Sequence, residues 1–199
     1  MTWSAEPALG EIVLRTPRLI LRNYHDADRA EFIRVHNVSA DYWRPWLPAS
    51  LLSEDPGMIF DRALEAARRG QTAGTQCRLV ATLHDGRMAG IFSLGEIVRG
   101  VFQCAYAGWR VSADLVGQGI GTEVVNGLLD IAFAQPPVGI ALHRVQANII
   151  PSNAASLRVA EKCGFRREGF APRYLKIAGQ WQDHVMTAKT AEEHQLAHA

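Results

Sequence analysis

The sequence predicts a single α+β domain, in which helices flank a mixed, mostly antiparallel sheet. Three segments near the middle of the chain, 77–83, 87–94 and 101–111, have the composition of strands and are joined by brief turns. Segments with helical spacing of apolar residues lie on both sides of this meander. No repeat, linker or break in composition divides the 199 residues. We therefore expect one domain over residues 1–199, with its core within about 14–190.

The segment before the meander predicts one strand and two helices. Apolar residues alternate in part over 14–23, which indicates the strand. An aspartate, a residue type that caps helices, begins a predicted helix over Asp26–Val38. Two tryptophans and two prolines in 41–50 favour an ordered loop, and a second helix is expected to follow Ser53 and to end at Gly70.

The meander itself contains a hairpin signal. Its first two strands are separated by His84-Asp85-Gly86, a turn in which glycine supplies positive φ without a steric cost. A helix is expected over 119–134, with apolar residues on one face, and Pro136-Pro137 closes it. A further strand follows over 143–150.

The remaining residues predict a short helix and a second hairpin. The helix is expected over 153–163, where Gly164 ends it. The hairpin joins strands over 165–178 and 181–189. The last ten residues are expected to fray.

Composition excludes several classes of function. A formal net charge of +1 gives no reason to expect a nucleic-acid or membrane partner. No apolar run is long enough to span a bilayer, and the first eleven residues lack the basic start of a signal peptide. Cys77, Cys104 and Cys163 form neither a metal-binding pattern nor a disulfide framework. We expect a cytoplasmic protein with three reduced, mostly buried thiols and no metal.

The most informative segment is a glycine-rich turn between a strand and a helix, within 109–122. Glycines at 117, 119 and 121 remove side chains where a ligand could approach the backbone. The first N–H groups of the following helix have no intrahelical partner and lie at the positive end of its dipole. This arrangement predicts an anion site suited to a pyrophosphate, although a plain glycine-rich turn would have the same sequence.

Three phosphate-binding turns compete for this segment. A Walker loop requires lysine after its last glycine, whereas this chain has Gly121-Thr122-Glu123. A Rossmann turn requires a third glycine where this chain has Thr122, and it follows the first strand of a βαβ unit. The third is the acetyl-CoA turn of the GNAT acetyltransferases, Q/R-x-x-G-x-G/A. Residues 116–121 resemble it except at Val116, where that family prefers Gln or Arg.

A second block strengthens the resemblance to the GNAT family. Within 143–169, Asn153 and Ser156 form an N-x-x-S pattern that is followed by a helix and by Lys162-Cys163-Gly164-Phe165. This order is similar to the second half of a GNAT domain. The resemblance implies that the strands containing residues 109–111 and 145–149 splay apart and hold the pantetheine arm of acetyl-CoA between them.

The resemblance also implies roles for individual residues. Trp109 and Val111 contact the arm, Asn153 bonds to its amide region, and Ser156 faces the thiol. Asn153 could instead be only a helix cap, and Ser156 plain surface. The residues implied to bind the phosphates form one run: Val116, Gly117, Gln118, Gly119, Ile120, Gly121 and Thr122. Many GNAT enzymes have a tyrosine seven residues after the asparagine, where this chain has Ala160.

Within that family, the sequence most resembles the RimJ-type ribosomal-protein alanine N-acetyltransferases. The resemblance rests on segments 44–46, 96–108 and 174–185 as well as on the two blocks. It implies that the acceptor is an N-terminal alanine of a ribosomal or other protein, acetylated by a monomer or weak dimer. Two alternatives remain open: an acetyltransferase for small amines or antibiotics, and a non-catalytic CoA-binding module.

Acetyl transfer needs a polarised carbonyl, a protonated leaving thiolate and a neutral amine. The Val111 N–H can hold the oxyanion, and Ser156 can donate to the sulfur. An α-amine with a pKa near about 8 is roughly one tenth neutral at pH 7, so a weak base suffices for direct attack in a ternary complex. Glu96 is the first choice for that base, although it could be a solvated edge carboxylate. The alternatives are Tyr174, Asp183 and His184.

Overall fold

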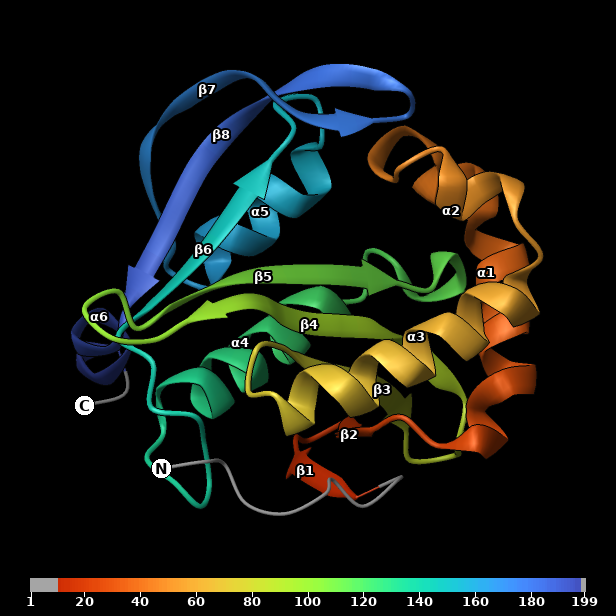
Figure 1. The fold of residues 1–199 in the computed structure, drawn as a ribbon, viewed down its shortest axis with the longest axis horizontal. Coiled ribbons are helices and arrows are strands. Elements are labelled where there is room, and N and C mark those ends of the chain that lie inside the picture. The colour runs from red at the N-terminus through yellow and green to blue at the C-terminus, as the bar shows by residue number, and fades with distance from the viewer. Residues whose placement is uncertain (1–10, 198–199) are drawn as a thin grey trace.

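The computed structural model describes residues 11–197. Residues 1–10 and 198–199 lie outside the described part, and so does the expectation about a signal peptide, which concerns mainly residues 1–10. Eight strands form one sheet in the order β1-β2-β3-β4-β5-β6-β8-β7 (Figure 1). The strands are β1 Ile12–Arg15, β2 Leu19–Asn23, β3 Cys77–Leu83, β4 Met88–Val98, β5 Cys104–Val111, β6 Arg144–Ile149, β7 Arg166–Ile177 and β8 Gln180–Thr190. Among these strands only β5 and β6 run parallel, which confirms a mixed, mostly antiparallel sheet.

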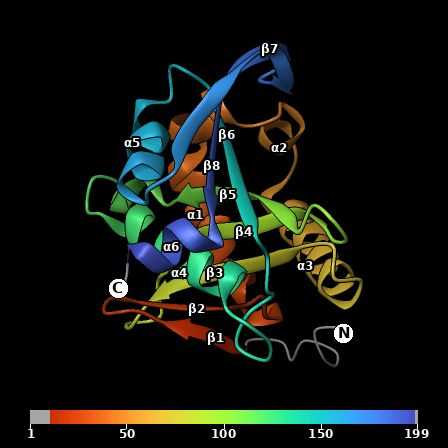
Figure 2. The same ribbon diagram turned by 90° about the vertical axis from the view of Figure 1, so that its left-hand side faces the viewer.

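Helices cover both faces of the sheet. They are α1 Arg29–Trp43, α2 Ser50–Ser53, α3 Pro56–Thr72, α4 Ile120–Phe133, α5 Ala154–Lys162 and α6 Ala191–Leu196, with 3₁₀ turns η1 Asp26–Asp28, η2 Arg44–Trp46 and η3 Ala113–Leu115. Figure 2 shows α4 and α5 on one side of the sheet and α3 on the other. No helix within the described residues is long and apolar enough to cross a membrane.

Strand alternation builds a separate core on each face of the sheet. Leu79 and Phe92 are fully buried against α4, whereas Val80 and Ile91, their neighbours in sequence, pack against α1 and α3. Successive side chains of a strand point to opposite faces, so a sheet with helices on both sides needs apolar residues at consecutive positions. The central strands are therefore anchored from both sides, and the strand ends beyond them are held in fixed positions.

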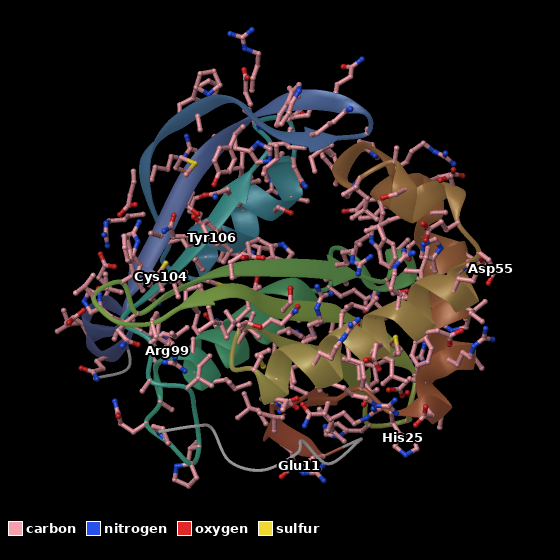
Figure 3. The ribbon with its side chains drawn as sticks, viewed as in Figure 1. Glu11, His25, Asp55, Arg99, Cys104 and Tyr106 are labelled. Atoms are coloured by element: carbon pink, nitrogen blue, oxygen red, sulfur yellow. The ribbon has the colours of Figure 1, made fainter. Side chains whose placement is uncertain are left out.

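The sheet opens at its one parallel pair. β5 pairs with β6 only from Cys104 to Tyr106, opposite residues 144–146. Beyond that point β5 continues beside β4, and β6 continues beside β8. The facing edges of 107–111 and 147–149 have no strand partner between them, which is the splay that the sequence resemblance implies. Figure 3 labels Cys104 and Tyr106 near the closed end of this gap.

The N-terminal strand prediction is wrong in one respect. Residues 14–23 form parts of two strands, β1 and β2, rather than one. They turn at Pro17, which has no N–H to offer a strand partner, and the Thr16 N–H closes the turn on Leu19 O at 2.9 Å.

The first helix begins and ends at other residues than the sequence predicts. His25 caps its 3₁₀ entry, because Nδ1 accepts from the Ala27 N–H at 3.0 Å, while Asp26 pairs with Arg68 at 3.2 Å. α1 then runs to Trp43 and takes up the start of the predicted loop 41–50. The Trp43 side chain is 3% exposed, so its burial in the core favours the extra turn.

Two other predicted ends are also wrong. α3 continues through Gly70, because the left-handed glycine that follows it is Gly74, with φ +67°. The last residues form α6 instead of fraying. Thr190 and Glu193 make a capping box there, in which the Thr190 N–H bonds to Glu193 Oε2 at 2.8 Å.

Candidate active site

A cavity of about 560 Å³ occupies the splay between β5 and β6. One part lies beside the glycine-rich turn, α4 and α5, and contains Gly117, Gly119 and Ser156 in its wall. The other part lies on the opposite face of the sheet, where the η2–α2 loop and the β7–β8 hairpin line it through Leu47 and Ile177. The gap thus connects two chambers through the sheet, one suited to a cofactor and the other to an acceptor.

The glycine-rich turn adopts the conformation that its glycines permit. Gly117 and Gly119 have φ of +76° and +79°, values that side-chain-bearing residues rarely adopt. Gly119 directly precedes α4, and the first backbone N–H after it with a main-chain acceptor is that of Glu123, bonded to Gly119 O at 3.1 Å. Within the described chain, the N–H groups of residues 119–122 have no protein acceptor and remain available to an anion.

An ion pair that the sequence does not predict supports this turn from behind. Arg18 bonds to Gln118 O at 2.8 Å and to Glu123 Oε2 at 2.6 Å, and Thr16 donates to the other oxygen of the same carboxylate at 2.5 Å. Burial raises the pKa of Glu123, but these hydrogen bonds outweigh it and lower the pKa below its usual value. The turn is therefore fixed before any ligand binds.

The exposed edge of β5 offers main-chain groups to the gap. The Ser112 N–H bonds to Ala89 O on β4 at 2.9 Å. Because the N–H direction alternates in an antiparallel ladder, the N–H groups of Trp109 and Val111 point away from β4 and into the gap. Trp43 Nε1 donates a hydrogen bond to Val111 O at 3.0 Å. The Val111 N–H has no acceptor within the described chain, so it is left for a ligand.

The start of α5 brings the second predicted block to the same gap. Asn153 caps this helix, with its Oδ1 accepting from the Ser156 N–H at 3.0 Å. Both residues also line the cavity, so the cap and the binding site coincide. The Ser156 hydroxyl makes no hydrogen bond within the described chain. At the other end of the helix, the buried ammonium of Lys189 donates to Cys163 O at 2.8 Å and fixes its position.

The structure brings nearly all of the predicted cofactor residues together. Ten of them line the cavity: Trp109, Val111, Val116, Gly117, Gly119, Ile120, Gly121, Thr122, Asn153 and Ser156. Gln118 is the exception, because its side chain turns back and bonds to Asp114 O at 3.2 Å. Within the described residues, no group of three or more His, Cys, Asp or Glu side chains could hold a metal.

Glu96, the predicted base, does not line the cavity. Glu96 is exposed, has φ +48° at an irregularity in β4, and lies beyond Gly95, the partner of Tyr106 at the closed end of the gap. Asp183 accepts from the Arg173 N–H at 2.7 Å and does not line the cavity. Neither carboxylate lines the cavity, and the base role of Glu96 stays a prediction.

His184 is the imidazole that does line the cavity. It is 3% exposed, and Nδ1 lies 3.0 Å from Gln182 O. A carbonyl oxygen can only accept, so Nδ1 carries the proton and Nε2 is left as an acceptor. Tyr174 packs edge-on against the ring at 5.6 Å, and its hydroxyl accepts from Asn148 Nδ2 at 3.3 Å. These contacts fix the imidazole at the acceptor side of the gap.

The charges along the cavity wall have one sign. Four cationic side chains line it: Arg78, Arg110, Arg158 and Lys162. Within the described residues, no carboxylate lines it. Arg158 and Lys162 belong to α5 on the cofactor side, whereas Arg78 and Arg110 belong to β3 and β5 and face the acceptor side.

One contact joins the two walls of the acceptor chamber. The Ala178 N–H, at the tip of the β7–β8 hairpin, bonds to Leu47 O in the loop after η2 at 3.0 Å. In Figure 1 the hairpin tip reaches across toward α2. Leu51, Leu175 and Ile177 add apolar side chains to the same part of the wall, and Trp43 and Trp46 line it as well. The exposed Trp181 lies outside the lining.

Comparison with known proteins agrees with this geometry. The family model described as an acetyltransferase (GNAT) domain matches residues 18–166, about three quarters of the chain. The [ribosomal protein uS5]-alanine N-acetyltransferase of Escherichia coli is 28% identical over 92% of this chain and 93% of its own. The probable N-acetyltransferase YjcK of Bacillus subtilis is 40% identical over 55% of this chain, and the match spans 58% of that relative. RimJ of Mycobacterium smegmatis, solved with a CoA disulfide, has a TM-score of 0.79 at 26% identity, covering 90% of this chain and 88% of that one.

Proposed function

The chain belongs to the GNAT family of acetyl-CoA-dependent N-acetyltransferases, and from this premise we propose that its acceptor is the α-amine at the N-terminus of a protein. The observation that carries the proposal is the charge of the acceptor chamber. Among the described residues, two arginines and no carboxylate line its wall. A polyamine or aminoglycoside is polycationic, so such a wall repels it. A peptide N-terminus carries one positive charge, which it must lose before it reacts.

Acetyl-CoA fits the cofactor chamber on several independent grounds. The free N–H groups of residues 119–122 and the positive end of α4 suit a diphosphate. Arg158 and Lys162 line the cavity on the same side and would supply positive charge for a further phosphate group of the cofactor. When bound, acetyl-CoA supplies an activated acyl carbon and a thiolate leaving group.

The residues of the gap divide the proton and charge transfers between them. The amine nitrogen forms the new bond to the acyl carbon while the carbon–sulfur bond breaks. The Val111 N–H donates to the carbonyl oxygen as negative charge develops there. Ser156 donates its proton to the departing sulfur and regains one from solvent, and His184 Nε2 accepts the proton that the amine loses. No covalent link to the protein is needed.

His184 and Glu96 give opposite expectations for the base. His184→Gln should lower kcat about 100-fold, because the amine proton then has no positioned acceptor. Glu96→Gln should leave kcat unchanged, since its carboxylate lies outside the cavity. Initial rates of both variants with saturating acetyl-CoA and peptide test the assignment. A lowered kcat for Glu96→Gln with an unchanged one for His184→Gln would return the role to Glu96.

Thiol release with three acceptors tests the proposed function. We expect release with an alanine-initiated peptide, and none when its N-terminus is formylated, although the peptide still carries a lysine. Release with spermidine or kanamycin alone would favour the small-amine alternative. Binding of acetyl-CoA in a calorimeter without release for any acceptor would favour the non-catalytic module.

The similarity to a uS5-alanine acetyltransferase supports a cytoplasmic ribosomal protein as the physiological acceptor, modified by a monomer or weak dimer. Intact-mass measurement of ribosomal proteins from cells with and without the gene product tests this assignment. One protein should gain a single acetyl group when the enzyme is present. If every ribosomal protein keeps the same mass, the acceptor lies elsewhere.

A further inference from the structure

We propose that Arg78 and Arg110 bind an acidic side chain of the acceptor, so that the enzyme prefers N-termini with Asp or Glu within the first four residues. The inference rests on the proposed function, because it concerns which N-termini enter the acceptor chamber. It goes beyond that function by naming the chemical group that is recognised and the residues that recognise it.

Strand register places the two arginines on one face of the sheet. Arg78 on β3 lies opposite Ser93 on β4, which lies opposite Gly108 on β5. Arg110 is two residues beyond Gly108, and side chains two apart on a strand share a face. Arg78, Ser93, Gly108 and Arg110 all line the cavity, so both cations and the open floor between them belong to the acceptor chamber.

Among residues 11–197, neither guanidinium has a carboxylate partner. Arg78 bonds through Nε to the Gln76 amide oxygen, and Arg110 lies over the Trp43 ring with 5.5 Å from Cζ to the centroid. The Nη1 atom of Arg110 is buried without a hydrogen-bond partner within the described chain. Burial lowers the pKa of this guanidinium, because desolvation disfavours its charge.

Other arginines of the described chain do not share this combination. Those that are partly shielded from solvent, Arg22, Arg34, Arg68 and Arg144, each pair with an aspartate or glutamate. Those without an ion pair apart from Arg78 and Arg110 are exposed: Arg15, Arg99, Arg158, Arg167 and Arg173. Shielded cations without an anion are costly, so an anion that enters the chamber recovers stabilisation that the free protein lacks.

A carboxylate suits this site better than other anions of a peptide. Guanidinium groups bind carboxylates through two parallel hydrogen bonds, a geometry that lysine lacks. The Tyr24 hydroxyl, which lies close enough to both arginines to interact with their charges, also has no hydrogen-bond partner within the described chain. Burial raises the pKa of Tyr24 to about 12, so this hydroxyl stays neutral and leaves the positive field of the arginines uncompensated.

The distance across the sheet indicates which position of the acceptor peptide can contact Arg78 and Arg110. Two strand spacings separate β5 from β3, about 10 Å at the usual spacing. An extended chain advances about 3.3 Å per residue, so three residues cover that distance. With the amine at the edge of β5, a side chain in positions two to four can reach Arg78 and Arg110.

Matched peptides test the inference. Alanine-initiated peptides that differ only by Glu, Gln or Lys at position two, three or four are compared by kcat/KM. We expect Glu to be preferred over Gln about tenfold at one position, mainly through KM, and Lys to be the poorest. Arg78→Gln should remove the preference, and Arg78→Glu should favour the Lys peptide over the Glu peptide.

Control measurements separate this inference from loss of folding and from failure of the proposed function. Arg15→Gln, an exposed arginine outside the cavity, should keep the preference for Glu, and acetyl-CoA affinity should be unchanged in both Arg78 variants. Equal kcat/KM for Glu, Gln and Lys at all three positions would overturn the inference and leave the proposed function standing. Acetylation of none of the peptides would overturn both.

Discussion

Gly119→Asp is expected to abolish acetyl-CoA binding. The residue has φ +79° and directly precedes α4, where the free N–H groups of residues 119–122 begin. Aspartate would place a negative charge at the site proposed for the diphosphate. At a separation of about 4 Å, the repulsion corresponds to a loss of affinity of about 100-fold or more. Calorimetric titration with acetyl-CoA measures the effect.

Two further variants separate repulsion from backbone strain. Gly119→Ala imposes the strained conformation without the charge, at a cost of about 1–2 kcal/mol, and should weaken binding only about tenfold. Gly86→Asp places the same side chain at φ +91° in the β3–β4 turn, where a Cβ meets open space, and should bind normally. If Gly119→Asp binds acetyl-CoA as well as Gly119→Ala, the turn does not hold the diphosphate.

Ser156→Ala is expected to lower kcat about 100-fold with little change in acetyl-CoA affinity. The hydroxyl makes no hydrogen bond within the described chain, whereas the backbone N–H that Asn153 caps is kept in the alanine variant. The proton donor is therefore lost and the helix start is preserved. Single-turnover rates and calorimetry measure the two quantities separately.

Ser152→Ala is the matched control for this variant. Ser152 lies four residues earlier, is exposed and does not line the cavity, so its removal should leave both kcat and affinity unchanged. An unaltered kcat in Ser156→Ala would remove the serine from the mechanism. A loss of affinity equal to the loss of kcat would indicate that it only binds the cofactor.

Local sequence signals were sufficient to predict the cofactor side of the molecule. Positive φ at Gly117 and Gly119, and the asparagine cap that presents Ser156, are properties of short segments. Single residue types nearly determine such backbone conformations, so the turn and the start of α5 could be predicted without knowing the rest of the fold.

The acceptor side could not be predicted in this way, because it depends on strand register. Arg78 and Arg110 are 32 positions apart and meet only because β3 and β5 both flank β4. Glu96 appears well placed along the chain, but an irregularity in β4 leaves it at the closed end of the gap. Arg18, which donates to Gln118 O, is 100 positions away from it in sequence. The capping box at Thr190 and Glu193, by contrast, was a readable T-x-x-E signal for α6.

The bond from Ala178 to Leu47 limits how an acceptor amine can arrive. It links the two walls of the acceptor chamber, so an acceptor that enters between these walls has to pass beneath the bonded segments. An N-terminal amine can enter in this way, because only one chain segment follows it. A lysine within a folded domain is flanked by two chain segments, and both would have to enter with it. Discrimination between terminal and internal amines can thus be topological, in addition to any difference in their basicity.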